Sequence, residues 1–455
     1  MFKLTLLFLS HMGLAFLMKQ FRIVSTLHAI ATLIFGIPWV LTSPRKKDER
    51  TMYLCAYITG AEVLWRMTKS MVFWEYGKYV VVLIFILTAH RYLFSSLVAW
   101  VYFLLLIPSL LITFQLVPDF ESFRQRVSFN LSGPLALMIC YVCMSKFKLS
   151  GEQFRKIILA LSVSLSGVAF LCSFNLYKVR QNITFTTDSN FAASGGFGPN
   201  QVSAVLGLGA LLAFLYCLDP SRKKNVRNLL IIFGLWFAGQ SALTFSRAGL
   251  AYALASIVMA GLFFIQNSKT RNRFLFFSVI VFLLGNFVLL PKFDQYTKGK
   301  LTERFNEHTT TGRTDIMKDE LIMFNEHPVF GIGVGQAEFS RKLFHQGVAS
   351  HTEFTRLLAE HGSFGILAIL MMFLMAFNAI RKVKTKKGKA FAVALASWSL
   401  FFMVGNGMRL VAPSFIFGLS AVTILPDIFS QNTASKKEKI KPAFKSIMPN
   451  PPAIE

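Results

Sequence analysis

Long apolar runs alternate with short polar segments along almost the whole chain. A helix needs about 20 apolar residues, and at least about 17, to cross roughly 30 Å of hydrocarbon. Runs near this length lie at 3–18, 23–42, 51–67, 71–90, 93–116, 128–144, 157–174, 199–218, 229–245, 248–266, 274–290, 363–380, 390–405 and 413–430. The pattern predicts an all-α polytopic membrane protein with about 12–14 transmembrane helices. A second apolar run follows the first without a small-residue cleavage site, so we interpret the first as a retained helix and not a signal peptide.

The polar segments differ in charge, and this predicts an orientation. Several are rich in Lys and Arg, namely 43–50, 145–156, 219–228, 268–273, 381–389 and 436–445. With fourteen spans they all fall on one side together with both chain ends, and short basic loops favour the cytoplasmic side. We therefore expect both termini to be cytoplasmic, with 433–455 as a disordered basic tail.

One large loop, Pro291–Thr352, lies on the opposite side in this map. A loop of this length is usually functional, so we expect the chemistry there. Within it, 313–324 has apolar residues at helical spacing and predicts a short amphipathic helix on or near the membrane. The chain then divides into 1–196 (N-terminal helices), 197–290 (a core that contains Arg247), 291–362 (the large loop with short helices), 363–432 (C-terminal helices) and 433–455.

Composition agrees with the membrane interpretation. Apolar residues make up 54% of the chain, charged residues only 15%, and the mean hydropathy is +0.52. The net charge is +26, and the basic residues lie in loops between apolar runs. They therefore indicate membrane topology and attraction to anionic lipid, and not a nucleic-acid site. All five cysteines lie inside apolar runs, which favours packing over disulfides or metal binding.

Two arginines are candidates for binding an anion. Arg247 stands between two apolar runs, in a tight helical hairpin on the side where cations are not favoured. Small residues, Ala248 and Gly249, would let another group approach it. Arg313 begins the predicted loop helix, where a cation gains nothing from the helix dipole. The alternatives are a snorkelling cap for Arg247 and a solvated surface side chain for Arg313.

The segment around His351 is the most informative. Ser350 and Glu353 have the spacing of a capping box, and Gly362 is a stop signal, so His351 is expected at the first position of a helix. The helix start disfavours imidazolium by about 0.3–1 kcal/mol, which leaves a neutral ring that can accept a proton. A capping histidine without chemistry is the alternative. Arg356 and Glu360 are expected to form a structural pair.

Two further features are weaker. Gly331, Gly333 and Gly335 favour a flexible turn over a nest of N–H groups for an oxyanion. Arg409 lies on the same side as the large loop and is a possible third cation. The loop has no Asp-x-Asp pair and no cluster of histidine ligands, so we expect no metal and no cofactor.

Four motifs in order resemble the bacterial O-antigen ligase and polymerase superfamily. They are Phe197-Gly-Pro-Asn200-Gln201; Leu243-Thr-Phe-Ser-Arg247-Ala-Gly249; Gly312-Arg313 with His327-Pro328-Val-Phe-Gly331-Ile-Gly333; and Ser350-His351-Thr-Glu353-Phe with Glu360-His361-Gly362. The resemblance covers roughly 197–375.

The resemblance implies a multi-pass glycosyltransferase of the bacterial inner membrane whose large loop and active site face the periplasm. It implies a donor glycan on undecaprenyl diphosphate and an acceptor hydroxyl on lipid A–core. His351 would be the catalytic base, and Arg247 and Arg313 would bind the diphosphate. Asn200, Glu353 and Arg409 are additional candidates. A polymerase that uses the same donor site is the alternative, and a transporter of lipid-linked sugar is a more distant one.

Overall fold

The chain folds almost entirely into helices. The computed structural model describes residues 2–42, 47–181, 183–218, 224–264, 268–306, 312–341 and 348–425. The predicted tail 433–455 lies outside the described residues. In chain order the helices of the first half are α1 (Phe2–Gln20), α2 (Arg22–Ile34), α3 (Gly36–Leu41), α4 (Lys47–Met67), α5 (Tyr76–Ala89), η2 (His90–Tyr92), α6 (Leu97–Leu104), α7 (Ser109–Leu116), α8 (Phe120–Met144) and α9 (Gly151–Val179).

The second half continues the helical pattern. Its helices are α10 (Pro199–Cys217), α11 (Lys224–Leu243), α12 (Ala248–Phe264), α13 (Ser268–Leu284), η3 (Gly285–Leu289), α14 (Leu290–Tyr296), α15 (Lys300–Asn306), α16 (Arg313–Glu326), α17 (Ala337–Ser340), α18 (Glu353–Lys382), α19 (Lys386–Asn406) and α20 (Ala412–Ser420). The large loop thus contains short helices, and the predicted helix at 313–324 is α16.

The prediction of an all-α polytopic membrane protein is confirmed, but fewer helices than expected can span a membrane by their own length and composition. Ten helical segments of the described residues are long and apolar enough, and α12 is a shorter apolar helix. The remaining predicted spans are α4, α5 and α20. Helix α4 carries several charged residues, α5 has 14 residues and α20 has 9.

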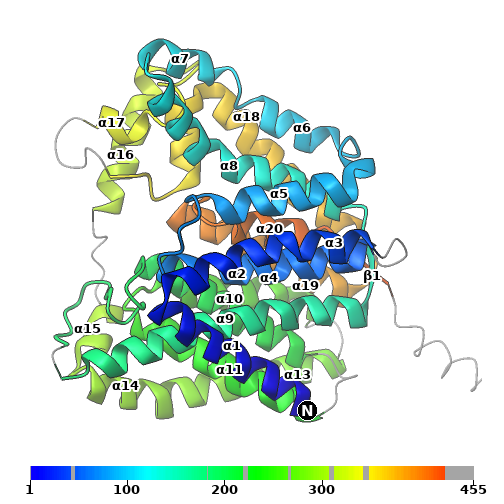
Figure 1. The fold of residues 1–455 in the computed structure, drawn as a ribbon, viewed down its shortest axis with the longest axis vertical. Coiled ribbons are helices and arrows are strands. Elements are labelled where there is room, and N and C mark those ends of the chain that lie inside the picture. The colour runs from blue at the N-terminus through cyan, green and yellow to red at the C-terminus, as the bar shows by residue number, and fades with distance from the viewer. Residues whose placement is uncertain are drawn as a thin grey trace, which may run out of the picture.

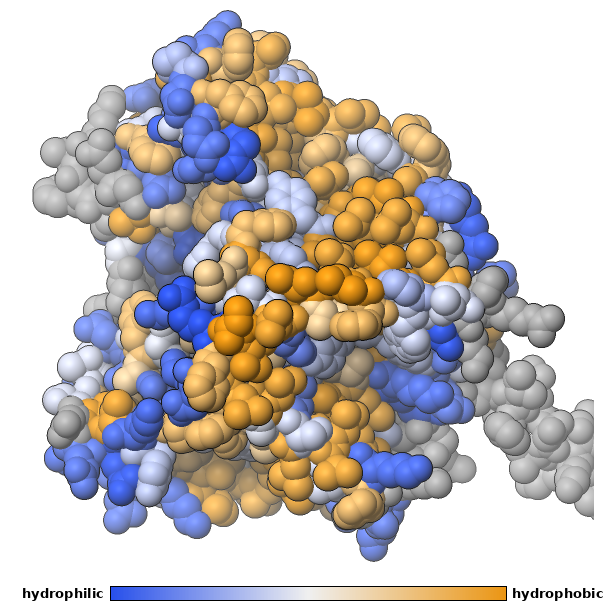
Figure 2. Space-filling view, viewed as in Figure 1, coloured by the Kyte–Doolittle hydropathy of each residue, from blue (hydrophilic) through white to orange (hydrophobic). Residues whose placement is uncertain are grey.

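The helices lie side by side and cross the molecule from one end to the other (Figure 1). Helices α15, α16 and α17 gather at the left, which we call the loop end; β1 and the start of α1 lie at the right, which we call the basic end. Helix α4 packs between α5 and α9, and α20 packs between α8 and α19. Apolar residues cover the middle of this face, with hydrophilic residues toward its left and right edges (Figure 2).

A two-stranded parallel sheet at the basic end was not predicted. Strand β1 (Lys148–Ser150) pairs with β2 (Thr423–Leu425), with Leu149 opposite Ile424. The run at 413–430 therefore does not continue as a helix beyond Ser420, because a β-branched stretch after α20 finds a backbone partner in the turn between α8 and α9. The pairing ties the end of α20 to that turn.

Helices α10 and α12 approach each other so closely that only glycine fits at the contact. A Cβ added to Gly249 would lie 2.0 Å from the carbonyl oxygen of Ser203, and one added to Gly207 would lie 2.2 Å from the carbonyl oxygen of Gly249. Ser203 and Gly207 are four residues apart on α10, the spacing of small residues that brings membrane helices together. Gly249 thus serves helix packing, and the predicted opening beside it for another group is filled by α10.

We expect Gly249→Ala to lower the midpoint of thermal unfolding in detergent, because overpacking at a backbone contact costs roughly 1–3 kcal/mol. The matched control is Gly13→Ala on α1, where an added Cβ meets nothing within 4 Å. This control should unfold at or slightly above the wild-type midpoint, since alanine favours helix. Equal midpoints for the two variants would contradict the packing role.

Candidate functional site

His351 lies just before α18 and not inside it. The residue that caps the helix is Thr352, whose Oγ1 accepts a hydrogen bond from the backbone N–H of Phe354 at 3.3 Å. The predicted capping box of Ser350 and Glu353 is wrong, because the Ser350 hydroxyl donates to the carboxylate of Glu320 on α16 instead. A tertiary contact has replaced the local cap, and the helix starts two residues later than predicted.

The His351 ring is nevertheless neutral near pH 7, for a different reason. Burial lowers the pKa of His351 to about 4, and the positive charges of Arg409, Arg313 and Arg341 add to the effect. The expected cause, the start of a helix, does not apply to a residue that stands outside it. A neutral imidazole retains a lone pair and can accept a proton.

Arg313, the second predicted arginine, is linked electrostatically to both His351 and Arg247. It is the first residue of α16, after Gly312 in the left-handed conformation (φ 65°). Burial lowers the pKa of Arg313, as do the nearby charges of Arg304 and Arg247, while Tyr252 on α12 opposes them. The guanidinium still stays protonated because its ordinary pKa lies so high. Arg313 is thus within electrostatic reach of Arg247 on one side and His351 on the other.

The turn that carries Arg247 is held by side chains from two other segments. Phe245 has a positive φ of 59°, and its carbonyl oxygen accepts a hydrogen bond from Nε of the buried Arg304 at 3.2 Å. The hydroxyl of Ser246 donates to Oδ1 of Asn200 at 2.7 Å. Asn200, an additional candidate from the sequence, therefore fixes the backbone beside Arg247.

Arg409 contacts the segment that precedes His351. Its Nη2 donates to the carbonyl oxygens of Ala349 at 2.8 Å and Ser350 at 2.7 Å. Its own carbonyl oxygen accepts from Nη2 of Arg66 at 3.0 Å, and Arg66 forms an ion pair with Glu62 at 2.7 Å. Arg409 both holds this segment and contributes positive charge at His351.

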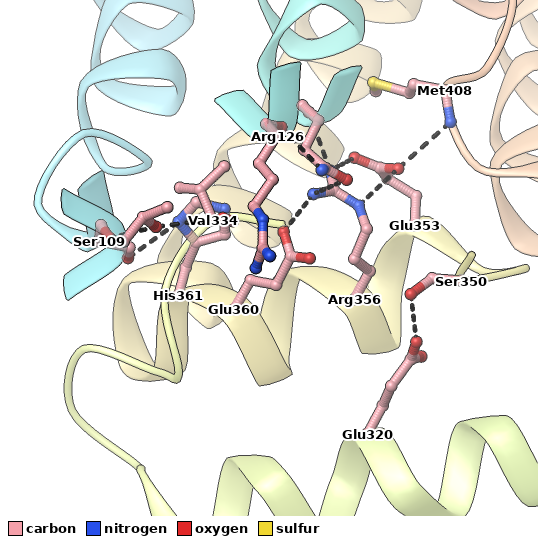
Figure 3. A network of polar contacts seen from close by, with 12 residues as sticks. Ser109, Arg126, Glu320, Val334, Ser350, Glu353, Arg356, Glu360, His361 and Met408 are labelled. Carbon is pink, nitrogen blue, oxygen red and sulfur yellow. Dashed lines mark hydrogen bonds and ion pairs between the residues drawn. The ribbon is translucent and has the colours of Figure 1, made fainter. Parts of the chain in front are cut away.

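A buried cluster that the sequence did not predict supports the same segment. The carboxylate of Glu320 on α16 pairs with Arg341 at 2.6 Å and also accepts from the hydroxyls of Ser350 and Thr355. Both charged side chains are fully buried. Figure 3 shows Glu320 pointing from α16 toward Ser350. On α16 the buried residues are Ile316, Glu320 and Met323, a helical stripe with one acid in it, and that acid is the signal that could have been noticed.

The first turns of α18 carry a second ionic cluster. Arg356 pairs with Glu353 and, as predicted, with Glu360 at 2.6 Å (Figure 3). Oε2 of Glu353 also accepts from the backbone N–H of Met408 at 3.2 Å. Glu353, another candidate from the sequence, is thus engaged by Arg356 and holds the turn before Arg409.

The glycine turn after α16 is tightly packed and not flexible. Gly331, Gly333 and Gly335 have φ values of 70°, 98° and 72°, which favour glycine. The N–H of Gly331 bonds to the carbonyl of His327, and that of Gly333 to the carbonyl of Glu360. A Cβ at Gly331 would lie 2.3 Å from the Glu360 carbonyl carbon. These two N–H groups already have carbonyl partners and are not available to an oxyanion. The turn instead packs against α18 near Gly362.

The site is therefore a cation-rich region with one neutral base. The charges of Arg313, Arg341 and Arg409 all act on His351, and Arg247 acts on Arg313. Guanidinium groups bind phosphate oxygens through paired N–H donors. Such a site can bind a doubly charged phosphate group next to a proton acceptor.

Fold and site together define a polytopic helical membrane protein with a cluster of arginines around a largely buried histidine at one end. Residues 230–370 match the family model of the O-antigen ligase. This match includes Arg247, Arg313 and His351, and it confirms the resemblance to the O-antigen ligase and polymerase superfamily. This part of the chain is thus similar to the O-antigen ligase family. A search of curated proteins finds no match.

We expect His351 to titrate far below an ordinary histidine. Because its folded pKa is about 4, it stays neutral between pH 5 and 8. In the unfolded chain His351 takes up a proton below about pH 6.5, whereas in the folded protein it does so only near pH 4. Its contribution to the free energy of unfolding therefore falls as the pH drops from about 6.5 toward 4. Histidine-labelled NMR, with His351→Gln for assignment, measures the value. Arg409→Gln should raise the pKa, and an unchanged or lower value would contradict the electrostatic cause.

Proposed function

We propose that the protein transfers a glycan from undecaprenyl diphosphate to an acceptor hydroxyl, as an O-antigen ligase does with lipid A–core. The observation that supports this most is the electrostatic chain from Arg247 through Arg313 to His351, inside the matched region. The three residues come from α12's start, α16 and the segment before α18, far apart in sequence. A polymerase is the second candidate, because it would use the same donor site and differ only in its acceptor.

The arginines act on the donor. Arg247 and Arg313 bind the oxygens of the diphosphate, and their planar forks suit bidentate bonding. As the bond between the anomeric carbon and the diphosphate breaks, negative charge builds on the leaving oxygen. Positive groups that are already in place stabilise that charge without reorganisation, which is usually the largest contribution to catalysis.

His351 acts on the acceptor. Its neutral ring removes the proton from the acceptor hydroxyl while the hydroxyl oxygen forms the new bond to the anomeric carbon. Diphosphate leaves from the opposite face, so the configuration at that carbon is inverted. The proton stays on His351 until it is released to solvent, and no metal takes part in these steps.

The distribution of charge supports an orientation. The short basic loops favour the cytoplasmic side, and on this proposal the basic end faces the cytoplasm and the loop end lies at the outer face of the bacterial inner membrane. The diphosphate of a lipid carrier lies at the membrane surface, and this matches a site built from segments at the loop end.

We expect His351→Ala to lower transfer by about 10²–10⁴-fold in nanodiscs supplied with lipid-linked donor and acceptor, because a general base contributes that much. The matched control is His327→Ala, an exposed histidine at the end of α16, which should retain wild-type turnover. Near-wild-type turnover of His351→Ala would remove the base assignment. Wild-type protein that moves the donor across the bilayer without forming a glycosidic bond would favour the transporter.

Deletion of the gene separates ligase from polymerase in the cell. Loss of a ligase leaves long glycan on the lipid carrier, because polymerisation continues while transfer to lipid A–core is blocked. Loss of a polymerase leaves lipid A–core that carries one repeat unit. Gel analysis of lipopolysaccharide together with the extracted carrier lipid gives the result, and the first pattern is the one expected here.

A further inference from the structure

A hollow of about 850 Å³ opens at the loop end, between the starts of α5 and α8 and the chain around α17. Aromatic side chains make up much of its lining, namely Phe73, Trp74, Tyr79, Phe129 and Phe339. Trp74 is 51% exposed and Phe339 is 46% exposed, so large ring surfaces lie open. We call this hollow the aromatic groove.

The aromatic groove reaches the segment that carries His351. Ala349, two residues before His351, is among its lining residues. A much smaller hollow of about 30 Å³ shares part of this lining and extends to Ser350 and to Arg409, one of the charges that act on the histidine ring. A chain-like ligand in the groove would therefore have its end next to the segment that carries the base.

Charge distinguishes the groove from the arginine site. Its charged lining is balanced, with Glu75 and Glu338 against Arg124 and Arg126. Arg124 is paired with Glu121 at 2.5 Å, and the Arg126 guanidinium lies 3.8 Å from the centre of the Phe339 ring. Neither Arg247 nor Arg313 is among its lining residues. A balanced lining suits an uncharged ligand rich in hydroxyl groups better than a diphosphate.

We propose that the aromatic groove binds the sugar chain of the acceptor. A sugar ring has a face of C–H bonds and an edge of hydroxyl groups. The exposed aromatic rings can cover such faces, and Arg126, Glu75 and Glu338 can bond the hydroxyls.

The choice of acceptor over donor rests on the proposed function. In a single displacement the acceptor hydroxyl enters opposite the leaving diphosphate. The diphosphate is assigned to Arg247 and Arg313, whereas the groove reaches Ala349, two residues before His351. The two substrates would then approach His351 from different segments of the protein.

An aromatic belt at the membrane surface is the competing explanation for exposed rings. Trp39 on α3 provides a direct comparison: it is 42% exposed and lies beneath Arg50 at 5.0 Å, yet it lines neither hollow. A belt role predicts the same small effect for both tryptophans, whereas the groove predicts an effect for Trp74 alone.

The experiment measures binding and turnover separately. Full-length protein with His351→Ala, in nanodiscs, is titrated by calorimetry with the oligosaccharide released by mild acid from lipopolysaccharide of the source strain. We expect saturable binding, weakened at least tenfold by Trp74→Ala or Phe339→Ala and unchanged by Trp39→Ala. With His351 intact, the two groove variants should raise KM for the acceptor at least tenfold while kcat and KM for the donor stay within about twofold.

Three results would overturn the proposal: no binding of the oligosaccharide, equal binding by the Trp74 and Trp39 variants, or a rise in KM for the donor alone. Phe339→Ala is included because Trp74 also stacks on Arg66, at 4.5 Å, and its loss could disturb Arg409. If the oligosaccharide binds through Trp74 but wild-type protein forms no glycosidic bond, the groove stands and the transferase function fails.

Discussion

Mutual repulsion of guanidinium groups is the constraint that shapes the loop end. Arg66, Arg341 and Arg356 each stay there because a buried carboxylate lies within 2.7 Å of the guanidinium. Arg409 instead bonds two backbone carbonyls. Removing one partner from such a buried pair typically costs roughly 3–5 kcal/mol, so these acids hold the arrangement together. The glutamates come from α4, α16 and α18, and the constraint therefore links helices that are far apart in the chain.

The same positive charge sets the chemistry of His351. Close to several cations and largely buried, the ring remains uncharged at neutral pH. A charged ring cannot act as a base, but a neutral ring with a pKa of about 4 is a weaker base than one that titrates near the operating pH. A bound diphosphate would raise this pKa through its negative charge, so the cations that attract the diphosphate keep the ring unprotonated only until the diphosphate binds. The nearby groove, with balanced charge and open aromatic rings, offers a chemically different surface to a second substrate.

Much of the fold was predictable because the bilayer imposes a length and a composition on each span. The helix α16 and the Arg356–Glu360 pair depend on neighbours within one helix, and both appear as predicted. The start of α18 was misplaced because Ser350 binds Glu320 from another helix, a contact that local spacing does not encode.

Arg341 was missed for the same reason. Its partner Glu320 stands 21 residues away on a different element, and the acid within the apolar stripe of α16 is the one local sign of the pair. Gly249 was assigned to ligand access from its size alone, whereas its use as a contact for α10 depends on tertiary packing. The influence of the Arg313 charge on His351, and of the Arg247 charge on Arg313, likewise needed coordinates, although each residue was a candidate from its own motif.

The break in α18 at Gly362 has a mechanical consequence. This residue has φ 58° and ψ −134°, so the helix changes course there. Before it, the turns are anchored by Glu353, Arg356 and Glu360; beyond it, Ile366, Leu370 and Phe377 turn outward. The bend is held in place, because the backbone N–H of Ser363 donates to the carbonyl oxygens of Pro328 and Val329. The lipid-facing part of the span thus leaves the anchored turns at a fixed angle.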